Sequence, residues 1–188
     1  MLNRRQLILS SSCFILPTNV FAQTKSLLQS KSKAEDIELN LYNIHTGEHF
    51  NDVIFSDNQP ITENLAKVHH LLRDFRQNES AIMDIKLLLG LANIKQHCTS
   101  VLAKSTDTPI QIISGYRSPI TNKMLNSTST GVAKKSLHMQ GRAIDFRVEG
   151  IRTQDLFKIS QSMKIGGTGK YTSSGFIHLD TGRLRSWG

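Results

Sequence analysis

The feature that most constrains this fold is the segment 136–148, where a polar stretch gives way to a run of strand-forming residues. Gly141 predicts a turn, and the sequence Ala-Ile-Asp-Phe-Arg-Val over 143–148 predicts a strand. His138 then lies on a loop, while Asp145 lies inside the strand on the same face as Ala143. The small Ala143 side chain leaves room beside the carboxylate, so this segment offers an imidazole and a carboxylate to one site.

The remaining periodicity predicts a mixture of strands and helices, and therefore an α+β domain. We expect strands over 37–41 and 53–55, joined as a hairpin, and further strands over 109–113 and 176–180. We expect helices over about 61–76 and 84–103, a short helix after Ser118-Pro119, and a helix that Thr153 caps and that runs to Met163. The glycine-rich stretch 166–169 predicts a tight loop.

Residues 1–22 have the features of a secretory signal peptide. Arg4-Arg5 precede a short apolar run, and small residues stand at the expected cleavage site after Ala22. The paired arginines also fit the twin-arginine export route. The apolar run is too short to span a bilayer, so we expect a periplasmic protein without stable membrane insertion, the alternative being an uncleaved anchor. A flexible lead over 23–35 and one domain over 36–188 complete the predicted organisation.

The charge balance limits the class of partner. The whole chain has a formal net charge of +8. It has no long basic block, and its aromatic residues are not interleaved with its charges, so nucleic acid is a poor partner. An exported basic protein suits an anionic polymer such as the cell wall, although charge supplies steering and not chemistry.

A third candidate metal ligand lies in the last predicted strand. His178 and Asp180 point to the same side of the strand 176–180. Zinc hydrolases keep three protein ligands and leave a fourth position for water. Two histidines and one aspartate suit this borderline-soft dication. His138, Asp145 and His178 therefore have the chemistry to hold one Zn²⁺ per chain, while on spacing alone a structural role for the two histidines is the alternative.

The wider pattern resembles a known signature. Ser136, His138, Gly141, Ala143 and Asp145 match Ser-x-His-x-x-Gly-x-Ala-x-Asp in full. This pattern is similar to that of the zinc D-Ala-D-Ala metallopeptidases, whose fold is shared by hedgehog-type domains. The resemblance implies a central antiparallel sheet, helices packed on one side and a zinc site on the open face. Stretches 43–48, 131–136 and 177–182 resemble, more closely, the MepK group of murein endopeptidases, and the similarity extends over about 37–187.

The resemblance also implies roles for residues around the ligands. The Ser-Gly-Tyr-Arg stretch over 114–117 is similar to a family motif whose arginine lies near the substrate, which here is Arg117. It would hold a substrate carboxylate or stabilise an oxyanion. Ser136 and Tyr116 are further candidates for substrate contact, with packing as the alternative for Tyr116. Asp180 is the nearest carboxylate in the motif, and it would serve either as general base or as a group that orients a ligand histidine.

These roles imply a zinc-dependent peptidoglycan endopeptidase that acts as a monomer on cross-linked stem peptides. The bond would join D-Ala to diaminopimelate or two diaminopimelate residues. A D-Ala-D-Ala carboxypeptidase is one alternative. A non-catalytic peptidoglycan-binding module is another, because Gly175 and Phe176 stand where relatives of this kind carry a proton-transferring side chain. Lys134-Lys135 precede the site and are either a solvated pair or a contact to an anionic stem.

Overall fold

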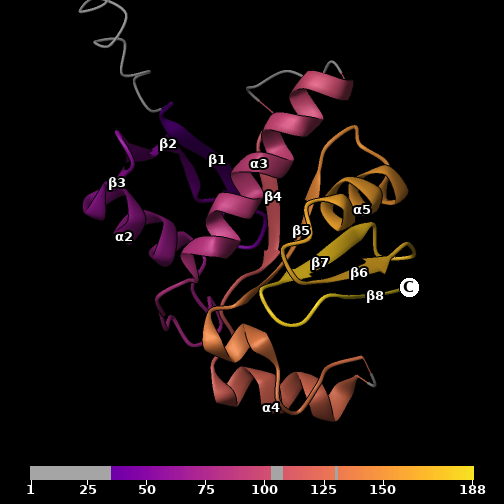
Figure 1. Ribbon diagram of the computed structural model, residues 1–188. Coiled ribbons are helices and arrows are strands. Elements are labelled where there is room, and N and C mark those ends of the chain that lie inside the picture. The colour runs from indigo at the N-terminus through magenta and orange to yellow at the C-terminus, as the bar shows by residue number, and fades with distance from the viewer. Residues whose placement is uncertain (1–34, 103–107, 130) are drawn as a thin grey trace, which may run out of the picture. The chain divides into compact units, whose positions relative to one another are not determined.

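A computed structural model describes residues 35–102, 108–129 and 131–188; the predicted signal peptide and nearly all of the predicted lead lie outside this range. The described residues form an eight-stranded sheet and four α-helices (Figure 1). The strands are β1 (Ile37–Asn43), β2 (His49–Ser56), β3 (Gln59–Pro60), β4 (Ile110–Ser114), β5 (Ala143–Val148), β6 (Gly167–Tyr171), β7 (Phe176–Asp180) and β8 (Arg185–Trp187). The helices are α2 (Thr62–Leu71), α3 (Ile85–Leu102), α4 (Pro119–Thr128) and α5 (Thr153–Ser162), with a 3₁₀ helix η1 (Leu137–Gln140). None of the described helices has the length and apolar character needed to span a membrane.

The α+β class is confirmed, but the sheet is mixed and not the antiparallel sheet that we expected. The strand order is β3-β2-β1-β4-β5-β7-β6-β8, and the pairs β1–β4 and β6–β8 are parallel. The connection from β1 to β4 contains α2 and α3, which is long enough to return the chain in the same direction. Strand β8 bypasses its predecessor β7 and pairs with β6. The sheet is therefore mixed.

Side-chain alternation divides the sheet into two unlike faces. On one face, which we call the apolar face, Phe146 is fully buried between its cross-strand partners Ile112 and Ile177. On the other, which we call the site face, Asp145 pairs with His178. Strand β5 thus supplies core side chains and the candidate metal ligand Asp145 at alternate positions, as its sequence predicts.

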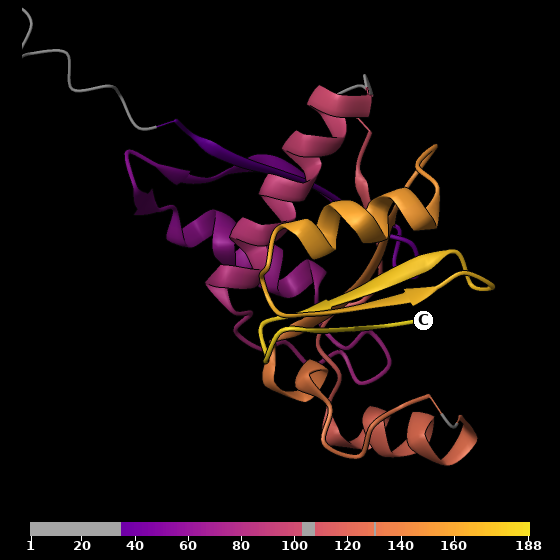
Figure 2. The same ribbon diagram turned by 45° about the vertical axis from the view of Figure 1, so that its right-hand side comes forward.

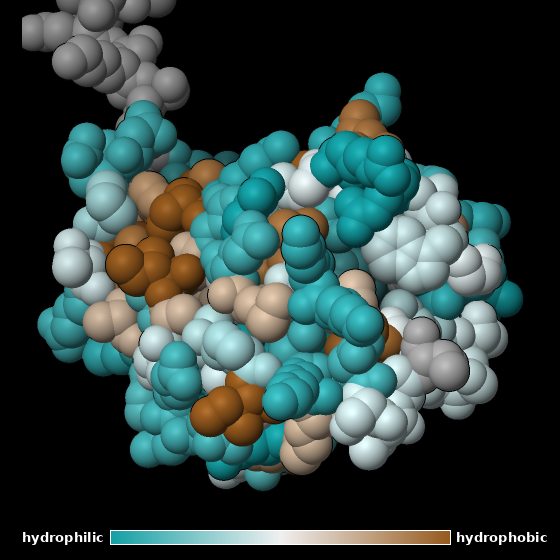
Figure 3. All heavy atoms as spheres, turned by 90° about the horizontal axis from the view of Figure 1, so that it is seen from below, coloured by the Kyte–Doolittle hydropathy of each residue, from teal (hydrophilic) through white to brown (hydrophobic). Residues whose placement is uncertain are grey.

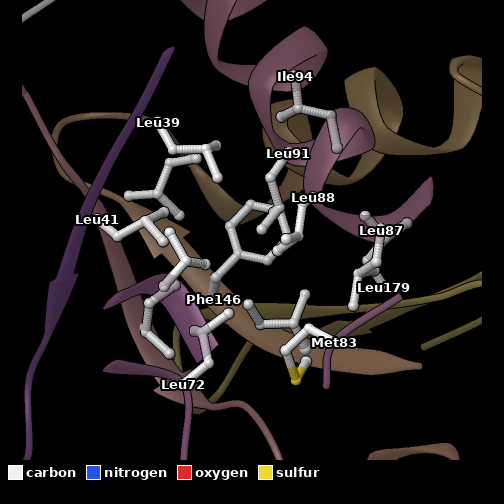
Figure 4. Close-up of a cluster of buried hydrophobic side chains, with 14 of the residues drawn as sticks. Leu39, Leu41, Leu72, Met83, Leu87, Leu88, Leu91, Ile94, Phe146 and Leu179 are labelled. Atoms are coloured by element: carbon white, nitrogen blue, oxygen red, sulfur yellow. The ribbon is translucent and has the colours of Figure 1, made fainter. Parts of the chain in front are cut away.

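Helices α3 and α5 cover the apolar face, while α2 packs against β2. Figure 4 shows Phe146 among the core side chains that α3 contributes, including Leu88 and Leu91. Helix α4 lies apart from these three, beyond the end of the sheet that carries η1 (Figures 1 and 2). Because nothing on the site face is covered by α2, α3 or α5, side chains of β5 and β7 remain available there to a ligand.

Three local predictions are wrong. The helix predicted to 76 ends at Leu71, because a β-bridge between Asp74 and Glu79 follows it. Thr153 is the first residue of α5 rather than its cap. The predicted tight loop over 166–169 belongs largely to strand β6, for a reason that lies in the site described below.

The surface of the described domain is mostly hydrophilic where α4 and its neighbours face the viewer in Figure 3, with apolar residues in separate patches. The large exposed apolar side chains are Ile82, Ile120, Met124 and Leu184. Scattered apolar residues of this kind are normal on a soluble surface.

Candidate metal centre

The candidate ligands meet because β-sheet register aligns them across neighbouring strands. Asp145 on β5 pairs with Ser114 on β4 and with His178 on β7. His178 in turn pairs with Gly169 on β6, which pairs with Trp187 on β8. Paired residues point to the same face of a sheet. A single row across the site face therefore holds two of the predicted ligands side by side.

The third ligand, His138, reaches this row from η1. The Ser136 hydroxyl accepts a hydrogen bond from the His138 backbone N–H at 3.3 Å and so caps the short helix. Gly141 ends the helix in the left-handed conformation, with φ of 66°. A side chain at that position would collide with the backbone of Ile82. The predicted turn at Gly141 is therefore present, and only glycine suits it.

The second nitrogen of each histidine is occupied, which selects the nitrogen left for a metal. His138 Nδ1 donates to the Gly115 carbonyl at 2.7 Å, so in the neutral ring Nε2 carries the lone pair. His178 Nε2 donates to Asp180 Oδ2 at 3.1 Å, which leaves Nδ1 facing Asp145. Histidines that bind zinc are held in this way by a carbonyl or a carboxylate.

Two of the three distances among the ligand atoms match the separation expected around a tetrahedral dication, and the third is shorter. His138 Nε2 lies 3.3 Å from His178 Nδ1 and 3.3 Å from Asp145 Oδ1. His178 Nδ1 lies 2.8 Å from the same oxygen. Two atoms that are each about 2.05 Å from a tetrahedral zinc are about 3.3 Å apart. His138, Asp145 and His178 are the only such group of three or more ligand residues in the described part of the chain.

Arg117 fixes the orientation of the ligand carboxylate. Its Nη2 donates to Asp145 Oδ2, and its Nε donates to Ser114 Oγ at 2.7 Å. The Arg117 backbone N–H also donates to the His138 carbonyl at 3.2 Å. Because one carboxylate oxygen is held by the guanidinium, Asp145 presents the other to the site.

The three candidate ligands differ in protonation. Burial lowers the pKa of His138, which keeps its ring neutral. Burial also works to lower the pKa of His178, but its hydrogen bonds with Asp145 and Asp180 outweigh this and raise it to about 8. Burial opposes ionisation of Asp145, yet His138, His178 and Arg117 hold the pKa of its carboxyl well below the usual range. The site thus contains an ionised carboxylate and one neutral imidazole, and at neutral pH a dication that binds His178 must displace a proton from its ring.

Asp180 is held by more partners than any other carboxylate of the site. It is fully buried, and its Oδ1 accepts from the backbone N–H groups of Gly167 and Gly182 at 3.0 and 2.8 Å. Arg185 donates to both oxygens, at 2.6 Å to Oδ2 and 3.1 Å to Oδ1. Burial alone would raise the pKa of Asp180, but its hydrogen bonds with His178, Arg185 and the backbone depress it strongly. It is consequently a weak proton acceptor.

The three candidate ligands open into a pocket of about 350 Å³. One wall, the loop wall, consists of residues 129, 131–133 and 135–138, and the other, the strand wall, consists of side chains from the strands β6, β7 and β8. Tyr171 and Phe176 stack on the strand wall with their ring centroids 4.7 Å apart. Trp187 lies against the His178 ring at 5.4 Å. The candidate metal site therefore lies in a concave surface whose strand wall carries three aromatic rings.

Comparisons with known proteins agree with this geometry. A family model described as peptidoglycan L,D-endopeptidase MepK matches residues 31–187. The chain belongs to the MepK family. The peptidoglycan L,D-endopeptidase MepK of Escherichia coli strain K12 is 39% identical over 98% of this chain and 97% of the relative. The probable peptidoglycan L,D-endopeptidase MepK of Haemophilus influenzae is 36% identical over 92% of this chain and 87% of the relative. No solved structure matches the chain significantly.

Most of the predicted site residues of this MepK-family chain lie in one pocket, and one does not. The three ligands, Arg117, Ser136 and Asp180 all line it. Tyr116 does not line it: its ring is buried, and its hydroxyl donates to Glu79 at 2.9 Å. Of the two roles predicted for Tyr116, the structure agrees with packing and not with substrate contact.

The contribution of β8 to this MepK-family site was not predicted from the sequence. Arg185 and Trp187 alternate on that strand, and both line the pocket. Gly167 and Gly169 make this possible, because a side chain at Gly167 would collide with Arg185 and one at Gly169 would lie 2.5 Å from Trp187 Cε2. These glycines, which predicted a loop, lie in strand β6 and leave space for the side chains of Arg185 and Trp187. The period-two spacing of Arg185 and Trp187 was the signal available in the sequence.

Proposed function

We propose that this chain is a zinc-dependent peptidoglycan endopeptidase that hydrolyses peptide cross-links between stem peptides. The observation that carries the proposal is the meeting of His138, Asp145 and His178 within 4.8 Å in the pocket of a MepK-family chain. The named relatives are L,D-endopeptidases. We accordingly infer that the bond cut here joins two diaminopimelate residues. Such a substrate lies outside the cytoplasm, and we propose a periplasmic, monomeric enzyme.

The donor set defines how a zinc ion would be held. His138 would offer Nε2, His178 Nδ1 and Asp145 Oδ1, the three atoms that hydrogen bonding leaves directed into the site. A bound zinc lowers the pKa of a coordinated water to about 7 and polarises a carbonyl. Three protein ligands leave one position for that water or for substrate.

Arg117 and Ser136 are positioned to hold the peptide. Arg117 uses Nε and Nη2 within the protein, while its Nη1 makes no hydrogen bond to any described residue. This nitrogen can donate to a substrate carboxylate or to the oxyanion that forms on the scissile carbonyl. Ser136 accepts from His138 through Oγ, and its own hydroxyl proton can be donated to the stem peptide.

We infer that Asp180 orients His178 rather than accepting the proton of the attacking water. Its oxygens already accept five hydrogen bonds, and two of these come from the Arg185 guanidinium. A carboxylate stabilised in this way has a low proton affinity and makes a poor general base. Its contact with His178 Nε2 instead fixes the tautomer of the neutral ring, in which the Nδ1 lone pair is directed to the metal.

One observation supports a non-catalytic binding module as the second candidate. Asp145 and Asp180 are the only carboxylates among the described residues that line the pocket, and each is paired with an arginine. A module that binds zinc and peptidoglycan without turnover would need no further base.

Digestion of purified sacculi with the zinc-loaded chain separates the candidates. Mass analysis of released muropeptides should show cross-linked dimers converted to monomers by loss of the diaminopimelate–diaminopimelate bond. Loss of terminal D-Ala alone would show a carboxypeptidase, and sacculus binding without release of muropeptides would show the binding module. The matched control is His138→Ala, which should no longer retain zinc. Its rate should fall roughly a thousand-fold or more, because several kcal/mol of transition-state stabilisation are lost with the metal. Full activity in that variant would refute the ligand assignment.

A further inference from the structure

The positive charges of the pocket are not equivalent. Arg117, Lys135 and Arg185 line it. Arg117 is ion-paired with Asp145, and Arg185 is ion-paired with Asp180. Lys135 makes no hydrogen bond or ion pair to any residue that the structure describes, and it is exposed. Lys135 is thus the pocket cation left to meet a charge on a ligand.

The loop wall fixes the backbone near Lys135 although its side chain is exposed. Asn122 of α4 is buried, and its Nδ2 donates to the carbonyls of Ala133 and Lys134 at 3.1 and 3.4 Å. On the other side of Lys135, the buried Ser136 caps η1. The ammonium group is therefore attached to a supported segment, next to the helix that carries His138, and not to a free loop end.

Lys134 offers an internal comparison. It is adjacent, has the same charge, is equally exposed and has no ion-pair partner among the described residues, but it does not line the pocket. If both lysines were only solvated surface residues, replacing either one would have the same effect on ligand binding. The placement of one inside the pocket and one outside makes their roles separable.

We propose that Lys135 binds the free carboxylate of diaminopimelate in the stem peptide and so selects stems in which this group is not amidated. The inference rests on the proposed substrate class. A diaminopimelate residue in a cross-link keeps a carboxylate that no peptide bond consumes. Amidation of that group removes its charge with little change of shape. An ammonium that has no partner in the protein gains a charge-assisted hydrogen bond from the carboxylate and loses it with the amide.

Binding can be measured without turnover because Trp187 is the single tryptophan of the chain and lies in the pocket. Its emission is followed while zinc-loaded protein is titrated with an uncross-linked muropeptide whose stem ends at diaminopimelate. The side-chain carboxyl of that residue is free in one preparation and amidated in the other. The proteins are the wild type, Lys135→Gln and the matched control Lys134→Gln.

We expect the wild type and Lys134→Gln to bind the free-carboxylate form roughly three- to ten-fold more tightly than the amidated form. Lys135→Gln should bind both forms alike, with the affinity that the wild type has for the amide. The proposal is overturned if Lys135→Gln keeps the preference, if Lys134→Gln loses it equally, or if the wild type shows none. An unchanged unfolding temperature of both variants excludes misfolding as the cause.

A second measurement separates this proposal from the proposed enzymatic function. The ratio of kcat/KM values for cross-linked dimers with free and amidated diaminopimelate should fall to about one in Lys135→Gln and stay at the wild-type value in Lys134→Gln. A wild type that shows the binding preference but releases no monomers would contradict the endopeptidase and leave the role of Lys135 standing. A wild type that cleaves both dimers equally would contradict the role of Lys135 and leave the endopeptidase standing.

Discussion

The two faces of the sheet differ in the interactions that hold their side chains in place. On the apolar face, Phe146 and its neighbours are held by packing against α3 and α5. On the site face, Asp145 and Asp180 are held by individual hydrogen bonds, each with named donors. Shape and volume determine stability on the first face, whereas the identity of single polar atoms determines chemistry on the second. The same strands build both faces, but successive side chains point to opposite faces. A substitution at one position should therefore affect one face and spare the other.

The largest effect on stability is expected from Phe146→Ala. The ring is fully buried in the centre of the core, and its removal leaves a cavity as well as losing the transfer free energy. We expect the free energy of unfolding to fall by about 3–5 kcal/mol in urea denaturation.

The same Phe146→Ala protein should still bind one zinc per chain below its unfolding transition, because no ligand contacts the ring from the site face. Its control is Ile82→Ala, at a side chain that is 81% exposed, where the change should stay within about 0.5 kcal/mol. Loss of zinc by folded Phe146→Ala would show that the two faces are coupled.

Asp180→Asn should produce an intermediate effect on the opposite face. An amide placed here would direct its NH₂ group either toward His178 Nε2 and Arg185 or toward the Gly167 and Gly182 N–H groups and Arg185, and all of these are donors. Because Oδ1 accepts more hydrogen bonds than Oδ2, we expect the NH₂ group to face His178. The His178 tautomer would then be free to change and place the proton on Nδ1. We expect zinc affinity to fall about 10–100-fold, as measured by competition with a chromophoric chelator.

A general base would behave differently at this position. Asp180→Asn would then retain zinc with unchanged affinity and lose only kcat. The control is Asp155→Asn, at a partly exposed residue of α5 whose carboxylate forms an ion pair with Arg152, where zinc affinity should not change. The comparison of affinity with kcat therefore decides which of the two sequence-based roles Asp180 has.

The sequence predicts the site face well wherever a single strand carries the signal. In β5, the alternation of Asp145 with Ile144 and Phe146 fixes both the strand and the face on which the carboxylate lies. The turn at Gly141 and the strand carrying His178 are equally local signals, and the structure contains both. These features depend on residues close in sequence, which is why patterning detects them.

The sequence fails where the signal depends on a distant strand. Gly167 and Gly169 indicate a loop when considered alone, because glycine is disfavoured within strands. Their actual role is to leave space for Arg185 and Trp187, which are 18 residues further along at the same spacing and reach them through the parallel pairing of β6 with β8. The mixed sheet was not predicted for a related reason. Whether β8 pairs with β6 or with β7 depends on tertiary contacts, which local sequence patterns do not reveal.

Gly169→Ala tests this last point and should have the smallest effect of the three. The new methyl carbon would lie 2.5 Å from Trp187 Cε2, so the ring must move, while the alanine itself is compatible with a strand. We expect the stability to change by only about 1 kcal/mol and zinc stoichiometry to stay at one per chain. The emission of Trp187, the single tryptophan, should shift because the ring leaves its contact with His178.

The matched control for Gly169→Ala is Gly131→Ala on the loop wall, where the nearest atom to the added carbon is 3.7 Å away and the emission should not change. Identical emission and stability in Gly169→Ala would mean that Trp187 does not depend on the glycine for its place. A large loss of stability would mean that β8 is part of the core and not only a wall of the pocket. The expected intermediate result, a displaced ring on an intact sheet, would show that the site face tolerates a change of shape that leaves its hydrogen bonds in place.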